Sequence, residues 1–236
     1  MRGIVSEQLE EFLTQVNIQI AQAARDNIIF TPDMVRGNLN KLAAFTSKSP
    51  DIDYAQDKNI KVDEQRIPVR VYSPDPTKTL PVVVYFHGGG HMCGSIELYD
   101  PMCRKIAHAG QCVVISVEYR LSPEHPYPAG VDDCQQAVIH YQQVLTDLNY
   151  NDNIFIAGDS AGGAIATTLA MRSLTNKDIK IDKQILIYPN VDYTGDSPSI
   201  QENGTGFLLE QSKIKWYFEH YFANNEDQVA VSPLFG

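Results

Sequence analysis

One short segment around residue 160 constrains the fold of this chain more than any other part of the sequence. An apolar run at residues 154–156 leads into Gly158-x-Ser160-x-Gly162, and an alanine-rich stretch at residues 164–174 follows. This order predicts a strand, a tight turn with Ser160 at its apex, and a helix. The glycines on either side lack Cβ atoms, so the strand and the helix can approach closely. The serine hydroxyl would then lie at a helix N-terminus, where negative charge is favoured.

The Gly-x-Ser-x-Gly spacing is not by itself proof of a nucleophile. It can occur by chance, and a glycine-rich turn between a strand and a helix can bind a phosphate group instead. The apolar run before Ser160 and the helical run after it supply the context that a nucleophilic serine requires. We therefore interpret Ser160 as a nucleophile.

The rest of the chain predicts an α/β fold. Short apolar runs, as expected of strands buried on both faces of a sheet, alternate with helical patterns. Alternating apolar residues at 59–72 indicate a β-hairpin or meander, after a polar linker at 47–57. This alternation predicts a mostly parallel central sheet with helices on both faces. The expected strands are residues 80–86, 112–117, 154–156 and 184–188, and the expected helices between them are 100–109, 132–145 and 164–174.

Three consecutive glycines follow directly after the first buried strand, in the sequence His87-Gly88-Gly89-Gly90. Glycines leave backbone N–H groups uncovered by side chains, and such groups can converge on an oxyanion. A flexible loop is the alternative, which the position directly after a buried strand disfavours. His87 and His91 would meet around a metal ion only on a helix, which three glycines prevent, so we predict no metal site.

Two amphipathic helices are predicted before any strand, at residues 4–24 and 31–45. We divide the chain into N-terminal cap helices (1–50) and a core (51–236), with 205–223 as a helix that covers the top of the sheet. The N-terminal helices either pack against the core alone or form a cap over a site. The aromatic residues at 207–222 serve core packing or line a pocket.

Composition excludes several classes of protein. The chain has 236 residues, 43% of them apolar and 20% charged, which is typical of one soluble globular domain. A net charge of −10 disfavours nucleic acid and anionic membranes as partners. No apolar run approaches the roughly 20 residues of a membrane span. The acidic N-terminus is not a signal peptide, and four cysteines without a Cys-x-x-Cys pair indicate free thiols, so we expect a cytoplasmic protein.

From about residue 71 onward, the sequence resembles the hormone-sensitive-lipase-like (bacterial class IV) esterases of the α/β-hydrolase fold. Three motifs match in order, and the N-terminal helices resemble that family's cap. The resemblance implies hydrolysis of small carboxylic esters without a cofactor, with Ser160 as the nucleophile and the N–H groups of Gly88, Gly89 and Ala161 as the oxyanion hole. His91 is a departure, because the family usually has an aromatic or bulky residue there. The motifs are His87-Gly88-Gly89-Gly90, Tyr119-Arg120-Leu121-Ser122-Pro123-Glu124 and Gly158-Asp159-Ser160-Ala161-Gly162-Gly163.

A serine nucleophile needs a base and an orienting acid, which in this fold follow the serine in the order Asp or Glu, then His. Asp192 follows a predicted strand and could serve as the acid, although a structural turn accounts for it better. His220 is the only histidine after Ser160, but it lies within the predicted covering helix. We therefore expect the acid and base to lie beyond residue 236.

Two other functions stay open at this stage. A non-catalytic relative that lacks the acid and base could bind small molecules beneath the cap, and a peptidase or amidase would use the same residues. A sheet that ends at its last predicted strand would expose an edge, which can pair with another chain. A homodimer is one form that such pairing could take.

Overall fold

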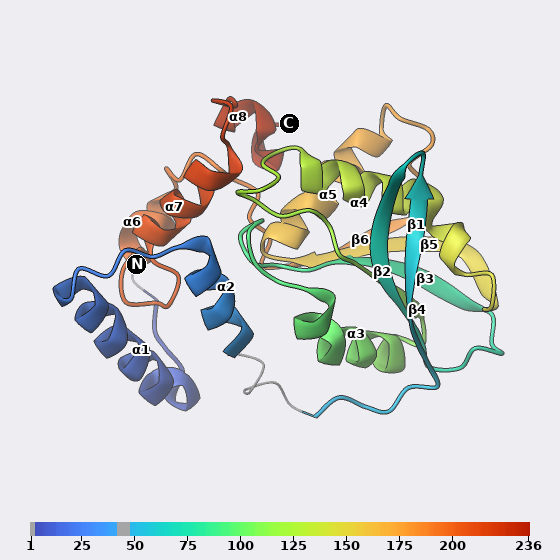
Figure 1. The fold of residues 1–236 in the computed structure, drawn as a ribbon, viewed down its shortest axis with the longest axis horizontal. Coiled ribbons are helices and arrows are strands. Elements are labelled where there is room, and N and C mark those ends of the chain that lie inside the picture. The colour runs from blue at the N-terminus through green and yellow to red at the C-terminus, as the bar shows by residue number, and fades with distance from the viewer. Residues whose placement is uncertain (1–2, 42–47) are drawn as a thin grey trace.

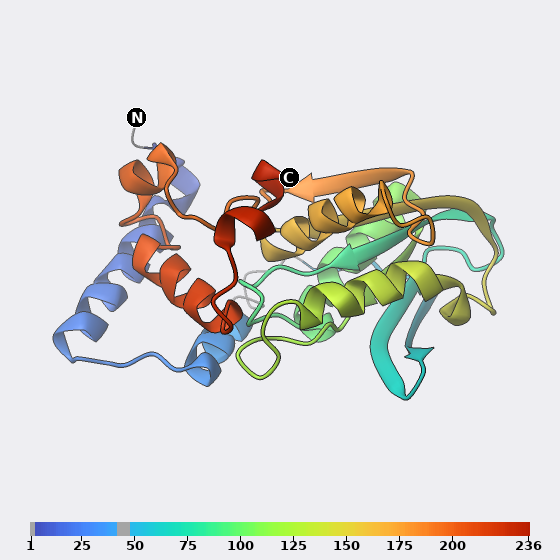
Figure 2. The ribbon, with the colours of Figure 1, turned by 90° about the horizontal axis from the view of Figure 1, so that it is seen from above.

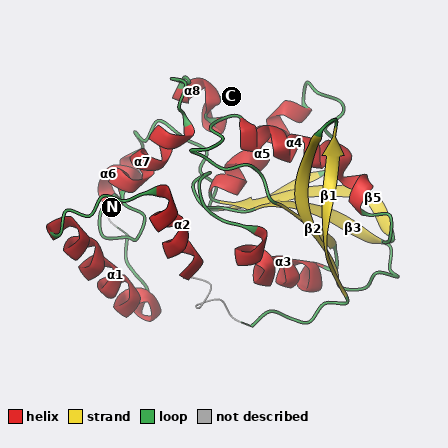
Figure 3. Cartoon of the chain, viewed as in Figure 1, coloured by secondary structure: helices red, strands yellow, loops and turns green. Residues whose placement is uncertain are grey.

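The computed structural model describes residues 3–41 and 48–236. Six strands form one sheet in the order β1-β2-β4-β3-β5-β6 (Figures 1 and 3): β1 (Tyr54–Val62), β2 (Gln65–Ser73), β3 (Leu80–Phe86), β4 (Val113–Val117), β5 (Tyr150–Asp159) and β6 (Lys183–Ile187). The first three strands in this order pair antiparallel, and β4, β3, β5 and β6 pair parallel. The predicted α/β class with a mostly parallel sheet is therefore confirmed.

The helices of the described residues are α1 (Glu7–Arg25), α2 (Pro32–Lys41), α3 (Ile96–Gly110), α4 (Ala129–His140), α5 (Ala161–Ser173), α6 (Pro198–Asn203), α7 (Gln211–Tyr221) and α8 (Gln228–Val231), with 3-10 turns at Tyr141–Val144 and Pro233–Phe235. Helix α3 covers one face of the sheet, and α4 and α5 cover the other. None of the helices in the described part of the chain is long and apolar enough to cross a lipid bilayer.

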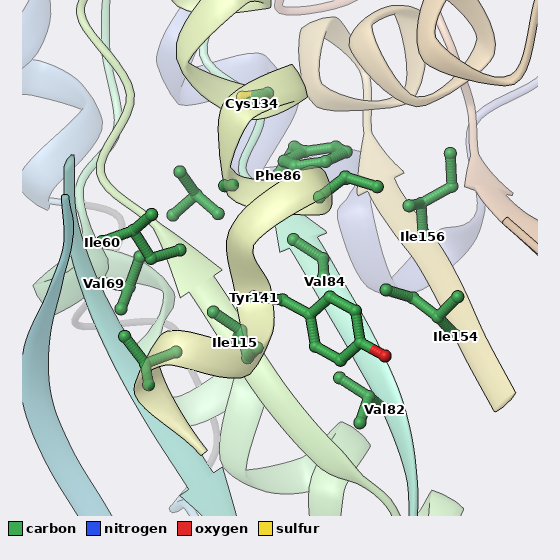
Figure 4. Close-up of a cluster of buried hydrophobic side chains, with 14 of the residues drawn as sticks. Ile60, Val69, Val82, Val84, Phe86, Ile115, Cys134, Tyr141, Ile154 and Ile156 are labelled. Atoms are coloured by element: carbon green, nitrogen blue, oxygen red, sulfur yellow. The ribbon is translucent and has the colours of Figure 1, made fainter. Parts of the chain in front are cut away.

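The central strand β3 shows why a continuous apolar run becomes a doubly buried strand. Val82, Val84 and Phe86 point to one face, where they join residues of α4 and α5 (Figure 4). Val83 and Tyr85 point to the opposite face and pack with residues of α3. Each aliphatic side chain buried in this way stabilises the fold by about 1.5–3 kcal/mol. These two layers hold the parallel strands in place beneath the site described below.

The parallel strands end together at one edge of the sheet. Phe86 lies opposite Val117 on one neighbouring strand and Gly158 on the other, and Asp159 lies opposite Ile187. The segments that follow these four strands therefore gather at the same edge. Carboxyl ends of parallel strands are the usual location of ligand sites in open α/β sheets.

The N-terminal helices and the helices after β6 gather beyond this edge, although they are far apart in sequence (Figures 1 and 2). Val35 of α2 forms a small apolar cluster with Met92 and Cys93, against which Trp216 and Tyr217 of α7 also pack. Helix α1 has no fully buried residue, so its predicted apolar stripe is only partly covered. A cap over the strand ends would thus draw on both regions of the chain.

Several boundaries differ from the sequence-based expectations. The β1 strand begins at Tyr54, inside the predicted linker, because residues 54–57 pair with the end of β2. The covering helix begins at Gln211 rather than near residue 205. Residues 42–45 of the second predicted helix lie outside the described residues. Among the described strands, β6 pairs only with β5 and is therefore an outermost strand of the sheet. Ile185 on this strand is 47% exposed.

Candidate active site

Ser160 occupies the turn between β5 and α5 in a strained backbone conformation. Its φ of 50° and ψ of −115° fall in a region that non-glycine residues rarely adopt. The turn is held from several sides: the Ser160 N–H donates to the Ile187 carbonyl (2.9 Å), and the Ser160 carbonyl accepts from the N–H groups of Ala164 and Asn190 (both 3.1 Å). The predicted strand, turn and helix are present, with the serine at the apex.

Gly162 shows why this turn requires glycine. A Cβ atom at this position would collide with the carbonyl oxygen of Phe86, at the end of β3, and would lie 2.7 Å from the carbonyl oxygen of His87. The start of α5 therefore lies directly against the start of the glycine loop. This close approach places the turn at Ser160 beside the start of the glycine loop.

The structure corrects one residue of the expected oxyanion hole. The N–H group of Gly88 donates to Oδ1 of Asp159 at 2.8 Å, so it is engaged by a carboxylate and cannot serve a substrate oxygen in this arrangement. Gly89 and Gly90 follow with φ values of +124° and +64°. Within residues 3–41 and 48–236, the N–H groups of Gly89, Gly90 and Ala161 donate to no protein acceptor.

The Tyr119–Glu124 motif forms hydrogen bonds with the glycine loop at residues 87–91. The hydroxyl of Tyr119 donates to the His87 carbonyl at 2.7 Å, and its ring stacks on the His87 imidazole. The N–H group and the hydroxyl of Ser122 both donate to the His91 carbonyl, at 2.8 and 3.1 Å. A motif noticed only through family resemblance thus fixes both ends of the 87–91 loop.

The same motif connects the loop to the N-terminal helices through Arg36 of α2. Its guanidinium donates to both carboxylate oxygens of Glu124 (2.9 and 2.6 Å) and to the carbonyls of Met92 and Ser122 (both 2.9 Å). The hydrogen bonds from Arg36 to the carboxylate lower the pKa of Glu124 to about 2. One charged side chain therefore ties α2 to both loops beside the turn.

His87 and His91 are buried separately and do not face a common ion. Nδ1 of His87 lies 2.8 Å from the Gly88 carbonyl oxygen, whereas Nε2 of His91 lies 2.9 Å from the Tyr193 hydroxyl. The His91 ring stacks on Tyr221 at 3.8 Å with an interplanar angle of 2°. Burial lowers the pKa of His87, and it lowers the pKa of His91 to about 3. Both imidazoles are therefore neutral groups of the interior.

Neither sequence-based candidate for the acid or the base forms a hydrogen bond with Ser160. Oδ1 of Asp192 accepts hydrogen bonds from the N–H and hydroxyl of Thr194, which makes it a local turn residue. Nδ1 of His220 lies 2.8 Å from the carbonyl of Trp216, one helical turn earlier. In the described part of the chain, no side chain forms a hydrogen bond with the Ser160 hydroxyl.

The aromatic face of α7 divides between packing and a cavity. Tyr217 packs over the loop, where a Cβ on Gly90 would lie 2.9 Å from its ring. Ile214, Phe218 and Phe222 line a cavity of about 810 Å³ together with Tyr193. Neither Ser160 nor any residue of the glycine loop is among the residues that line this cavity.

The sheet order and the strained serine at the turn after β5 define an α/β hydrolase, and comparisons agree. A family model described as alpha/beta hydrolase fold matches residues 83–236. The chain is 31% identical over 202 residues to an ethyl acetate hydrolase of Pseudomonas putida, covering 82% of this chain and 64% of that protein. It is 40% identical over 157 residues to a carboxylesterase of Mycobacterium tuberculosis, covering 66% and 49%.

A solved esterase from Pyrobaculum calidifontis matches with a TM-score of 0.87 and 31% identity, covering 99% of this chain and 75% of that one. The chain therefore belongs to the α/β-hydrolase family, and its resemblance to the hormone-sensitive-lipase-like esterases is confirmed. It spans between about half and just under two thirds of the length of the two curated relatives.

Two residues that position the site were not singled out from the sequence. Arg36 was not singled out because its hydrogen-bond partners lie 56 to 88 positions further along the chain. Asp159 is one of the variable positions of the Gly-x-Ser-x-Gly pattern. The only feature that marks Asp159 in the sequence is its position next to Ser160. Its importance comes from the hydrogen bond that it accepts from Gly88, 71 residues earlier in the chain.

Proposed function

We propose that this chain belongs to a serine carboxylesterase that hydrolyses small or short-acyl carboxylic esters through an acyl-enzyme on Ser160. The observation that carries this proposal is the backbone of Ser160, held at φ 50° between a buried strand and a helix. Strain of this kind persists only where surrounding contacts maintain it, and it clusters at functional sites. The named relatives of this chain, which are esterases and ester hydrolases, support the same reaction class.

In the proposed reaction, the Ser160 hydroxyl attacks the ester carbonyl carbon, and the carbonyl oxygen gains negative charge. The N–H groups of Ala161 and Gly89 would donate to that oxygen, with Gly90 in place of Gly88 as the third donor. These groups are available because they have no acceptor in the described parts of the protein, and the Ala161 N–H is at the start of α5. Fixed donors of this type are worth about 10²–10³-fold each in rate.

The alcohol leaves, the acyl group stays on the Ser160 oxygen, and water then releases the acid. Both steps require a base that takes a proton and returns it to the leaving group. We propose that the acid and base come from residues beyond position 236, since no described side chain forms a hydrogen bond with the serine hydroxyl. Without them, only about 10³–10⁴-fold catalysis over water would persist.

The test is an intact mass spectrum of the natively expressed protein before and after treatment with a fluorophosphonate. We expect one added label per chain that is absent in Ser160→Ala. Ser173→Ala, at the other end of α5, is the matched control and should label like the wild type. Hydrolysis of p-nitrophenyl acetate and butyrate is measured in parallel and should disappear with the label.

The mass also reports the length of the native protein. A mass well above the 26.4 kDa of these residues, together with the Ser160-dependent label, supports a full esterase. A mass equal to these residues with no label would overturn the proposal and favour the alternative, a non-catalytic relative that binds small molecules. The cavity of about 810 Å³ beside α7 would then be the first place to look for such a ligand.

A further inference from the structure

Asp159, the residue before the proposed nucleophile, is a buried carboxylate with three hydrogen-bond donors. Oδ1 accepts from the Tyr85 hydroxyl at 2.7 Å and from the Gly88 N–H at 2.8 Å. Oδ2 accepts from the Tyr99 hydroxyl at 3.0 Å. The side chain is only 4% exposed, and a carboxylate buried to this degree is costly unless it is hydrogen-bonded. Such a group is expected to have a specific role.

The two tyrosines are permanent donors to this carboxylate. Burial raises the pKa of both Tyr85 and Tyr99 well above the ordinary value for tyrosine, and the neighbouring Asp159 carboxylate raises it further. Both hydroxyls therefore keep their protons throughout the range in which an esterase works. The carboxylate is oriented by β3 and α3, two elements that carry these rings and belong to the rigid core.

The third donor is different, because it belongs to the glycine loop. Gly88 has no room for a side chain: a Cβ atom there would collide with Oδ2 of Asp159 and lie 3.0 Å from the Asp159 carbonyl oxygen. The glycine thus lies directly against the carboxylate, and its N–H is bound by it. Asp159 is in turn bonded covalently to Ser160. One side chain therefore links the loop that would bind the oxyanion to the turn that would carry the nucleophile.

We propose that Asp159 is a positioning residue for the oxyanion hole: it binds the Gly88 N–H and thereby fixes the N–H groups of Gly89 and Gly90 relative to Ser160. This inference rests on the proposed esterase function. Its physical basis is that oxyanion donors act only when they are held in place before the reaction. A displacement of about 1 Å can cost about 10²-fold in rate, so a lost anchor should reduce turnover more than substrate binding.

The test compares Asp159→Ala with two variants that keep the anchor. Asp159→Asn retains an oxygen for Gly88 and Tyr85, and its NH₂ group can donate to the Tyr99 hydroxyl. Tyr99→Phe removes only the donor to Oδ2. We expect kcat for p-nitrophenyl butyrate to fall about 10²-fold in Asp159→Ala with KM within about threefold, and both other variants to stay within about tenfold of wild type.

A trifluoromethyl ketone, which forms an anionic adduct with an active serine, provides a second readout. Its inhibition constant should rise in parallel with the loss in kcat/KM in Asp159→Ala. A residue that only stabilised the fold would lower the melting temperature but leave both kinetic quantities unchanged in the folded fraction. That result would overturn the inference, as would Asp159→Asn losing as much activity as Asp159→Ala.

A measurement without substrate separates this inference from the proposed function. His87-Gly88 is the only His-Gly pair in the sequence, so ¹³C′-histidine and ¹⁵N-glycine labelling selects the Gly88 amide in a carbonyl-filtered spectrum. We expect its hydrogen exchange to accelerate at least about tenfold in Asp159→Ala and to change little in Asp159→Asn. Equal exchange in wild type and Asp159→Ala would overturn the anchoring role. If the fluorophosphonate does not label Ser160 in the wild type, the proposed function alone is overturned.

Discussion

Replacing His91 with phenylalanine should remove part of the acid sensitivity of this protein. The His91 side chain is 3% exposed, stacked on Tyr221 and within 2.9 Å of the Tyr193 hydroxyl. Burial is the main cause that lowers its pKa to about 3, with a smaller contribution from His87. Phenylalanine preserves the aromatic stack but has no group that titrates between pH 3 and pH 7.

The sign and size of the effect follow from proton linkage. An unfolded chain binds a proton on His91 below a pKa of about 6.5, whereas the folded protein does not bind it until the pH approaches about 3. Stability is therefore lost as the pH falls from about 6.5 to about 3. At about 1.4 kcal/mol per pH unit, the loss at pH 5 is about 2 kcal/mol. This loss depends little on the exact pKa of His91 in the folded protein, because pH 5 lies well above that pKa.

The assay is equilibrium unfolding in urea at pH 7.5 and pH 5.0, followed by the fluorescence of Trp216, the only tryptophan. The quantity of interest is the pH-dependent loss in wild type minus that in His91→Phe. All carboxylates and His87 are present in both proteins, so their contributions to the pH-dependent loss cancel in the difference. Tyr193 and Tyr221 have raised pKa values and therefore do not titrate between pH 5.0 and pH 7.5. Strain from the φ of 59° at position 91 affects both pH values equally.

We expect the wild type to lose about 2 kcal/mol more than His91→Phe between these pH values, or roughly 1 M in urea midpoint. If both proteins lose the same free energy, His91 accepts a proton inside the fold, and its burial in a neutral aromatic site is refuted. The lower absolute stability expected of the variant, which leaves the Tyr193 hydroxyl without its partner, has no bearing on this difference.

Three further changes have expected outcomes. Gly88→Ala should reduce kcat/KM for p-nitrophenyl butyrate about 10²-fold, because its methyl group would displace the Asp159 carboxylate; undiminished activity would contradict the close packing. Gly37→Ala, within α2 and with no atom within 4 Å of the new methyl group, should raise unfolding free energy by about 0.5–1 kcal/mol in urea titrations and leave activity unchanged; a decrease would contradict it. Arg36→Met should speed tryptic cleavage near residue 41. In the wild type, cleavage by pepsin should likewise accelerate as the pH falls from about 4.3 to about 2. The lowered pKa of Glu124 means that its ion pair with Arg36 is complete above that range and lost within it.

Much of the architecture was predictable because its signals are local. The run at residues 80–86 is continuous and apolar, and it became β3 with the same boundaries. The glycines at 158 and 162 indicated a close approach of strand and helix, and a Cβ on Gly158 would indeed collide with the backbone of Gly162. Boundaries were less accurate where tertiary pairing decided them. Tyr54 begins a strand although residues 54–57 are mostly polar, since they pair with β2 and lie largely on an exposed surface.

The arrangement of the site was predictable only in part, because its decisive contacts join distant residues. The family resemblance implied that the N–H groups of Gly88, Gly89 and Ala161 would point at one oxygen. It did not indicate that the carboxylate of Asp159 would take the first of these N–H groups, since that pairing depends on how β3 and β5 lie in register. The register is set by side-chain packing across the whole sheet, which no local motif encodes.

The three loop glycines show how such long-range constraints meet in one short segment. Gly88 is restricted by the Asp159 carboxylate, and a Cβ on Gly89 would collide with the Cys93 carbonyl, where the chain turns back. Gly90 is restricted by the ring of Tyr217 on α7. The neighbours thus belong to the turn after β5, to the loop itself and to a helix beyond β6. Because each glycine is confined by a different element, the loop is shaped before any substrate arrives, which is the condition under which backbone N–H groups stabilise an oxyanion effectively.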